Sequence, residues 1–192
     1  MLIEYSCRKV LIGEGWGLEH GENEEALGNE AGYPELRVKE KNPYFAQLLM
    51  VPYAGRTSEM TAVCTYSYQA VLFGDRERTA AVRETLTRIA KEEMTHFTVL
   101  GRLIVLLGGD PRIGVCSRGS YLYWAGSCTN TEKDFGKALR QDIADEEHTV
   151  TEYAALREKI CDPNVSGILE RMRREEEEHV FFLQRLAEVP GI

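Results

Sequence analysis

One template occurs twice in the chain, and each copy places polar groups on an otherwise apolar helical stripe. Residues 86–103 and 169–186 both follow L-x2-[I/M]-x3-E-x2-H-x3-L-x2-L, and the offset is 83 residues (176 minus 93). Burying a carboxylate without a compensating partner is strongly unfavourable. Since a Glu and a His three residues apart share one helix face, the pairs Glu93 with His96 and Glu176 with His179 are each placed to hold a cation.

Hydrophobic periodicity predicts four long helices, with a long connection between the second and the third. The expected ranges are 57–73, 77–107, 131–160 and 165–187. Either Thr57 or Ser58 is a suitable N-cap for the first helix. Residues 110–130 contain several Gly and Ser residues and no helical stripe, and they are expected to form a long crossover loop. The expected fold class is therefore all-α, a four-helix bundle with one crossover.

The beginning of the chain lacks sustained periodicity and is expected to form an irregular arm. The expected division is an N-terminal arm or extended lead-in over residues 1–43 and the bundle over residues 44–192. A short strand is expected around Leu36 and Val38, and a first apolar piece over residues 44–53 precedes the bundle helices. Because the arm has little core of its own, we expect it to take part in association between copies.

The first and third helices each place a carboxylate in line with core positions. Glu59 continues the apolar stripe of the first helix, and Tyr66 follows on the same stripe. In the third helix Glu146 lies in line with apolar residues, whereas the adjacent Glu147 shares a face with Arg140 and is expected to point outwards. Tyr66 is expected near Glu59, either as a group beside a metal or as a core tyrosine with a satisfied hydroxyl.

These groups together form a metal-ligand set in the centre of the bundle. The expected ligands are Glu59, Glu93, His96, Glu146, Glu176 and His179. Four bare carboxylates could not all stay ionised so close together, and two divalent cations would neutralise them. Such a set is the dinuclear carboxylate site of ferritin-like proteins. Mixed oxygen and nitrogen ligation suits manganese or iron.

A simpler interpretation treats these acidic segments as solvated helix faces. Glutamate runs such as that in REEEEH are usually exposed, and a lone E-x2-H arises often by chance. Two copies in matched register, each accompanied by a Glu that interrupts the stripe of the preceding helix, favour the metal site instead. His148 and His20 are expected at the surface.

Composition excludes several other classes of protein. The net charge of −8 argues against a nucleic-acid or anionic-membrane partner. No segment is long and apolar enough to span a bilayer, and the opening residues do not read as a signal peptide. The five cysteines are scattered with no CxxC pair, so neither a zinc ribbon nor a rubredoxin-type site is expected. A cytoplasmic location is the default expectation.

The chain resembles the manganese catalases, and especially their short spore-coat relatives. The segments that carry the resemblance are YPELRVKEKNPYFAQLL, SEMTAVCTYSYQ, KEEMTH, LGGDPR, DIADEEH and EEEEHVFFLQRL, together with a loop containing Trp124 and Asn130. The resemblance implies that Glu93 bridges two metals, with Glu59 and His96 on one and Glu146 and His179 on the other. Glu176 lies beside the metals in such catalases, whereas the matching Glu of ferritin-like di-iron oxidases is a ligand and a bridge.

The function implied is disproportionation of hydrogen peroxide to water and oxygen at two Mn ions, or alternatively two Fe ions. Glu176 is the candidate for moving protons between peroxide and solvent, with Tyr66 as a second candidate catalytic group. One alternative is a di-iron oxidase, ferroxidase or peroxidase that reacts with dioxygen. Another is a structural coat or shell component whose metals stabilise the bundle. A homo-oligomer is expected, in the cytoplasm or, by the resemblance, in a spore coat.

Overall fold

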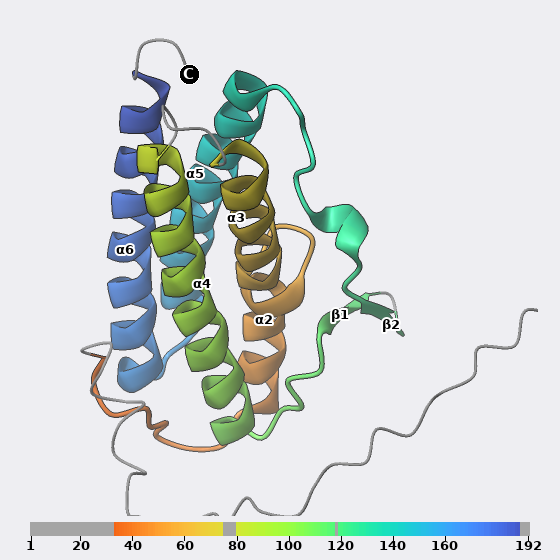
Figure 1. Ribbon diagram of the computed structural model, residues 1–192. Helices are drawn as coiled ribbons and strands as arrows, with labels where there is room; N and C mark the ends of the chain where they lie inside the picture. The colour runs from red at the N-terminus through yellow and green to blue at the C-terminus, as the bar shows by residue number, and fades with distance from the viewer. Residues whose placement is uncertain (1–32, 75–79, 118, 189–192) are drawn as a thin grey trace, which may run out of the picture.

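Long helices dominate the part of the chain that the structure describes, residues 33–74, 80–117 and 119–188 of a computed structural model. The helices are α2 (Pro43–Ala54), α3 (Glu59–Phe73), α4 (Ala80–Leu106), α5 (Phe135–Lys159) and α6 (Pro163–Ala187). They pack side by side as a bundle, which confirms the expected all-α class (Figure 1). Among the described residues no helix is long and apolar enough to cross a membrane.

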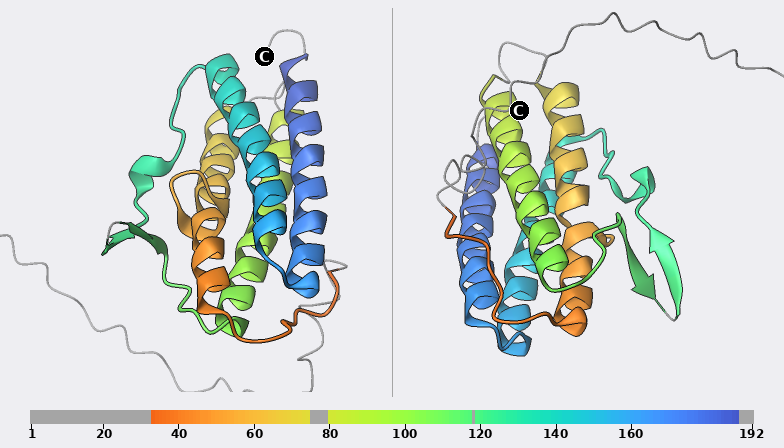
Figure 2. Two further views of the ribbon diagram at one scale, coloured as in Figure 1. Left: turned by 180° about the vertical axis from the view of Figure 1, so that it is seen from behind. Right: turned by 90° about the horizontal axis from the view of Figure 1, so that it is seen from below.

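The first column of the bundle consists of two helices. Figures 1 and 2 show α2 in line with α3, and α4 contacts both of them. The chain leaves α2 at Gly55, and Ser58 then caps α3 by accepting a hydrogen bond from the backbone N–H of Thr61. The predicted cap is thus confirmed. The apolar piece before it is itself a helix, which begins with Asn42 as N-cap and Pro43 in its first turn.

The described part of the lead-in, residues 33–42, contains no strand, so the strand predicted around Leu36 and Val38 was wrong. Both side chains pack against the apolar core, and the segment is tied to the start of α6. The backbone N–H of Lys39 donates to Asp162 Oδ2 at 2.7 Å, and Arg37 Nε donates to Asn164 Oδ1 at 3.1 Å. The alternation of apolar residues therefore reflects packing on one side, with no partner strand. Residues 1–32 of the predicted arm, including His20, lie outside the described residues.

The crossover between α4 and α5 is long, as predicted, but it contains regular structure. Strands β1 (Gly114–Ser117) and β2 (Ser120–Tyr123) form an antiparallel hairpin, and a short 3-10 helix η2 (Gly126–Cys128) follows. The loop is fastened to the bundle by Trp124, whose Nε1–H donates to Thr61 Oγ1 at 2.8 Å. It therefore covers the outer side of α3 (Figure 2).

The core is divided into two apolar clusters with polar residues between them. On α4 the buried Leu86 and Ile89 belong to one cluster, and Leu100 and Leu103 belong to the other. On α6 the order is reversed, since Leu169 and Met172 lie in the second cluster and Leu183 and Leu186 in the first. Each copy of the sequence template thus runs from one apolar cluster to the other, in opposite directions. The Glu and His of both copies fall in the layer between.

Candidate metal centre

All six residues of the predicted ligand set are buried in one layer of the bundle. They come from four helices: Glu59 from α3, Glu93 and His96 from α4, Glu146 from α5, and Glu176 and His179 from α6. No member is more than 3% exposed. Glu147, by contrast, is exposed, as is His148. The structure therefore brings together every residue of the predicted set, and it separates Glu146 from its neighbour.

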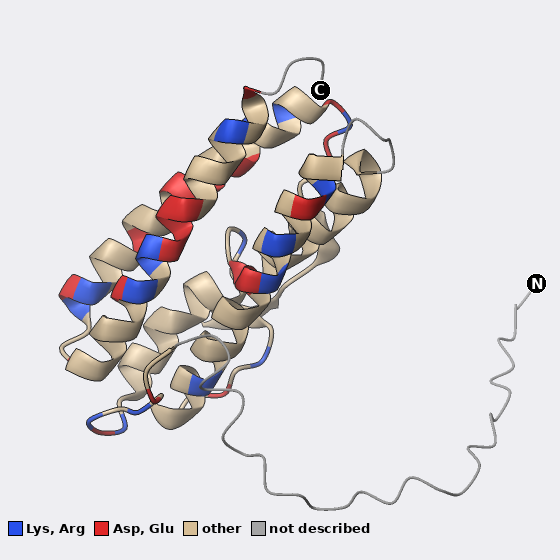
Figure 3. Cartoon of the chain, turned by 60° about the vertical axis from the view of Figure 1, so that its left-hand side comes forward, with Lys and Arg blue, Asp and Glu red and all other residues tan. Residues whose placement is uncertain are grey.

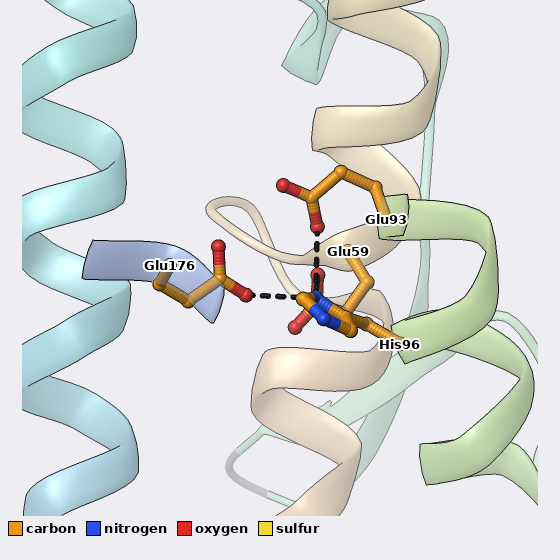
Figure 4. A group of neighbouring side chains, drawn as sticks. All are labelled: Glu59, Glu93, His96 and Glu176. Carbon is orange, nitrogen blue, oxygen red and sulfur yellow. Dashed lines mark ion pairs between the residues drawn. The ribbon is translucent and has the colours of Figure 1, made fainter. Parts of the chain in front are cut away.

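The donor atoms fall into two overlapping groups of four. One group is Glu59, Glu93, His96 and Glu176, and the other is Glu93, Glu146, Glu176 and His179; within each group the donor atoms lie within 4.8 Å of one another. Figure 4 shows the carboxylates of the first group converging on the His96 ring. Two groups that share two carboxylates are the arrangement required for two adjacent ions.

The shared carboxylates each direct one oxygen to each histidine. Glu176 Oε1 lies 2.8 Å from His96 Nδ1, and Glu176 Oε2 lies 2.9 Å from His179 Nδ1. Glu93 Oε2 lies 3.4 Å from His96 Nδ1, and Glu93 Oε1 lies 3.0 Å from His179 Nδ1. Glu176 is therefore placed like Glu93, between the two histidines, and is not displaced outwards.

The pKa values of the four glutamates are shifted in two directions: two are raised and two are lowered. Burial, together with the charges of Glu93 and Glu176, raises the pKa values of Glu59 and Glu146 well above their usual range. Burial also opposes the ionisation of Glu93 and Glu176. Nevertheless their pKa values are lowered. Contacts with Glu59 and His179 lower that of Glu93, and the two histidines lower that of Glu176.

The two histidines are shifted towards the protonated form. Burial opposes their positive charge, but Glu176 beside His96 and Glu93 beside His179 raise the pKa values of both rings well above 6.5. These directions favour protons on Glu59, Glu146 and both histidine rings in the metal-free cluster, with Glu93 and Glu176 as carboxylates. In that state the charges of the six groups balance.

Several buried polar atoms in this layer make ion-pair contacts but no hydrogen bond of normal geometry. They are both oxygens of Glu93, Oε1 of Glu176 and Nδ1 of His96. Buried polar groups are ordinarily hydrogen-bonded, so unsatisfied atoms gathered at one point call for an explanation. Carboxylate oxygens and imidazole nitrogens are suitable ligands for manganese and iron. The residues present thus fit a pair of divalent ions.

Each histidine also contacts a carboxylate outside the cluster, which was not predicted from the sequence. His96 Nε2 lies 3.1 Å from Glu175 Oε2, and His179 Nε2 lies 2.9 Å from Glu92 Oε2. Glu175 also accepts a hydrogen bond from the Tyr33 hydroxyl. A carboxylate on the far ring nitrogen orients a metal-binding histidine and raises its basicity. The available signal was that both copies read E-E-x2-H.

The four glutamates 175–178 of α6 have different surroundings: one belongs to the cluster, one contacts a histidine from outside it, and two face solvent. Figure 3 shows acidic residues midway along α6, with basic residues towards its beginning. Glu176 is fully buried and Glu175 half-buried, whereas Glu177 and Glu178 are exposed. Glu177 accepts a hydrogen bond from Arg173 Nη1 at 2.6 Å. The solvated-face interpretation therefore holds for only part of the run.

Two tyrosines connect the terminal carboxylates across the bundle. The Tyr66 hydroxyl on α3 donates to Glu146 on α5, and the Tyr153 hydroxyl on α5 donates to Glu59 on α3. Tyr66 thus lies beside the cluster, as predicted. Its hydrogen-bond partner is Glu146, however, and not Glu59, which is nearer in the sequence. Tyr153 follows Glu146 by seven residues, the spacing that also separates Tyr66 from Glu59. This second tyrosine was not predicted as a site residue.

We expect Glu92→Ala and Glu175→Ala each to weaken metal binding by roughly 10–100-fold, because each removes the carboxylate that orients one histidine. The loss should fall on one ion, that of His179 for Glu92 and that of His96 for Glu175. Titration of the metal-free protein with Co²⁺, followed by its visible absorption, measures the two affinities. Glu178→Ala on the exposed flank of α6 is the matched control, and equal losses in all three variants would contradict the assignment.

Comparison with known proteins gives the same type of fold. The family model of the ferritin-like domain matches residues 56–190. The structure is similar to that of KatB, a manganese catalase from Anabaena PCC7120, with 25% identity, a TM-score of 0.67, and coverage of 80% of this chain and 78% of the other.

A second solved structure is more distant. It is a bacterioferritin from Rhodobacter capsulatus with a metal-free dinuclear site, at 20% identity and a TM-score of 0.61, covering 77% of this chain and 86% of the other. At that identity the likeness shows the fold alone. A comparison with curated protein sequences finds no match.

Proposed function

Because this chain belongs to the ferritin-like domain family, we propose that it binds two manganese ions in the buried cluster and disproportionates hydrogen peroxide to water and oxygen. The observation that carries the proposal is the pair of donor groups with two shared carboxylates. The similarity to a manganese catalase over 80% of the chain supports the choice of reaction. The described residues also include the carboxylate partners that such ligands require.

In this proposal Glu59 and His96 hold one ion, and Glu146 and His179 hold the other. Glu93 and Glu176 are ligands common to both, since each directs an oxygen to each histidine. Bound ions supply the two-electron chemistry that reduces one peroxide molecule and oxidises the next.

The side chains around the ligands position them and hold protons. The hydroxyls of Tyr66 and Tyr153 orient the two terminal carboxylates, while Glu92 and Glu175 fix the histidine rings. The two apolar clusters border the layer at its two ends along the bundle. The proton-moving role of Glu176 remains a prediction, because both of its oxygens are directed at histidines. Tyr66 is a second group able to hold a proton at the cluster.

A di-iron oxidase or ferroxidase is the second candidate function, with dioxygen as its substrate and two Fe as its cofactors. The observation that favours it is the position of Glu176 between the two histidines, where it can serve as a ligand to both ions. The sequence resemblance implied such a bridging Glu for the di-iron oxidases and a more distant one for the catalases. A coat or shell role gains no support from the comparisons. A homo-oligomer is proposed from the family resemblance.

Elemental analysis of the purified protein, paired with oxygen release on addition of peroxide, tests the proposed function. About two Mn per chain with rapid oxygen release is the expected result for a two-ion site. Two Fe, no oxygen release from peroxide and consumption of dioxygen after ferrous loading would assign the chain to the oxidases instead. Glu147→Gln, an exposed neighbour of the ligand Glu146, serves as the control and should match the unmodified protein.

A further inference from the structure

A small polar cavity lies between α3 and α5, directly beside the carboxylates. Its volume is about 30 Å³, enough for a molecule the size of water or slightly larger. Three of the four cluster glutamates line it, namely Glu59, Glu93 and Glu146, but neither histidine does. The remaining lining consists mainly of hydroxyl and carboxylate side chains. A molecule in this cavity therefore meets the oxygen side of the cluster.

Asp142 is the least expected member of this lining. It is 1% exposed, and its Oδ1 accepts hydrogen bonds from Gln69 Nε2 at 3.1 Å and Asn130 Nδ2 at 2.9 Å. Its second oxygen, Oδ2, is buried and makes no hydrogen bond within the described residues. Asp142 belongs to neither donor group of the metal centre. Two amides thus fix one oxygen of the carboxyl, and the other is a buried acceptor without a protein partner on a residue that lines the cavity.

A wider cavity outside the bundle adjoins this inner one. It measures about 580 Å³ and lies between α3, α5 and the crossover residues 127–133. Thr57, Thr61 and Asp145 line both cavities, so the two are neighbours. The crossover loop is held at this point by the backbone N–H of Asn130, which donates to Thr65 Oγ1 at 3.1 Å. Polar side chains thus line the whole way from the outer cavity through the three shared residues to the carboxylates.

On the side of the cluster that faces α4 and α6, the described residues line a cavity of a different kind. A cavity of about 640 Å³ lies there, and its lining includes His96, Glu92 and Glu175. The ring nitrogen that His96 directs to that side is already bonded to Glu175, and Glu175 also accepts the Tyr33 hydroxyl. A molecule arriving from that side would meet the bonded ring of His96 and the carboxylates of Glu92 and Glu175. Glu59, Glu93 and Glu146, which line the inner cavity, do not line this one.

We propose that the α3–α5 cavity is the port through which a small uncharged hydrogen-bonding molecule, of the size of hydrogen peroxide, reaches the cluster, and that Asp142 positions it there. This inference rests on the proposed function for the identity of the substrate. Its chemistry suits the cavity, because peroxide has two O–H donors and the free oxygen of Asp142 is an acceptor. Burial raises the pKa of Asp142 to about 7, so the group also exchanges protons near neutral pH.

Two substitutions on α5 form a matched pair that tests the port. Thr149 lines the inner cavity, whereas Thr151 lies on the exposed side, and both hydroxyls donate to the carbonyl four residues earlier. Thr149→Leu should fill the cavity and lower kcat/KM for peroxide by at least about tenfold, since a volume of this size holds only one small molecule. Thr151→Leu should leave it unchanged. Both proteins should retain two metals per chain.

Asp142→Asn keeps the shape and the hydrogen bonds to Oδ1 but removes the second acceptor. We expect kcat/KM for peroxide to fall by about tenfold, as for loss of a hydrogen bond to a charged group. A rise in KM with metal content intact is the expected signature, and a purely structural role would change the melting temperature instead. Unchanged KM in Asp142→Asn, with an unchanged rate in Thr149→Leu, would overturn the proposal.

Nitric oxide binding separates failure of the port from failure of the proposed function. This small uncharged molecule binds ferrous ions without turnover, so its rate of association with the Fe²⁺-loaded protein reports access alone. A slower rate in Thr149→Leu than in Thr151→Leu supports the port even if peroxide releases no oxygen. Equal rates overturn it. Slower loading of Fe²⁺ itself, with nitric oxide binding unaffected, also overturns it and makes the cavity a cation route.

Discussion

Replacing Glu93 or Glu176 with Gln is expected to remove both metal ions, whereas Glu59→Gln or Glu146→Gln should leave about one ion per chain. The first two residues belong to both donor groups, and the last two belong to one group each. At free metal concentrations 100 times Kd, each bound ion stabilises the folded protein by about 2.7 kcal/mol. Loss of one ion should therefore lower the free energy of unfolding by about 2.7 kcal/mol, and loss of both ions by about twice that amount.

Elemental analysis and thermal unfolding with and without Mn²⁺ measure these losses. Glu147→Gln is the matched control, since Glu147 is the exposed neighbour of Glu146. It should bind two ions and unfold at the temperature of the unmodified protein. Two ions retained by Glu176→Gln would show that Glu176 is not a ligand. That result would restore the catalase-type role beside the metals that the sequence resemblance allowed.

Metal binding is expected to release about four protons for each pair of ions. The metal-free cluster holds these protons on Glu59, Glu146, His96 and His179, whose pKa values are all raised, and the ions must displace them. The overall affinity for two ions should then fall by up to about 10⁴-fold for each unit by which the pH is lowered. Calorimetric titration in buffers of different ionisation enthalpy counts the protons, and release of fewer than two would contradict this protonation pattern.

The same shifts determine how the metal-free protein responds to pH. For the two raised glutamates and the two histidines the folded-state pKa lies above the ordinary values of 4.5 and 6.5, so the folded chain holds more protons than the unfolded chain. Their contribution to stability is present at low pH and is lost as the pH rises through the folded-state values. Glu93 and Glu176, with lowered pKa values, contribute above 4.5 and lose that contribution as the pH falls.

Urea unfolding between mildly acidic and mildly alkaline pH tests this expectation. The free energy of unfolding of the metal-free protein should decrease as the pH rises, and saturating Mn²⁺ should reverse the slope because the ions need deprotonated ligands. The variant Glu147→Gln again provides a control with an intact cluster. A metal-free protein that becomes more stable on the alkaline side would contradict the raised pKa values.

The six residues of the buried layer could be predicted from the sequence because the signal is local. A Glu or a His that interrupts an apolar stripe is visible within one helix, and the same test distinguished Glu146 from Glu147. Glu92 and Glu175 were missed because their partners are on another helix, about 80 residues away. On the flank of a stripe, periodicity does not separate a residue facing solvent from one facing a neighbouring helix. Tyr153 is a fully buried residue on the stripe of its helix, and it was missed because its hydrogen-bond partner, Glu59, is on another helix.

The differences in the fold have a similar origin. The apolar piece over residues 44–53 was predicted, but the alignment of α2 with α3 in one column depends on packing against α4. The hairpin of the crossover depends on pairing between Gly114 and Tyr123, a contact between short segments that composition does not encode. The strand expected around Leu36 and Val38 had the right alternation but no partner. In each case the missing information was a tertiary contact.

Each helical hairpin of the bundle carries one half of the site. The pair α3 and α4 supplies E-x6-Y and E-E-x2-H, and the pair α5 and α6 supplies the same two motifs in the same order. The two hairpins thus carry matching halves of the site. Among the described residues Tyr33 distinguishes them, because its hydroxyl bonds to Glu175 and not to Glu92. Asp142, four residues before Glu146, distinguishes them as well, because the corresponding position before Glu59 is Gly55. A preference for filling one of the two positions first is expected to follow from such differences.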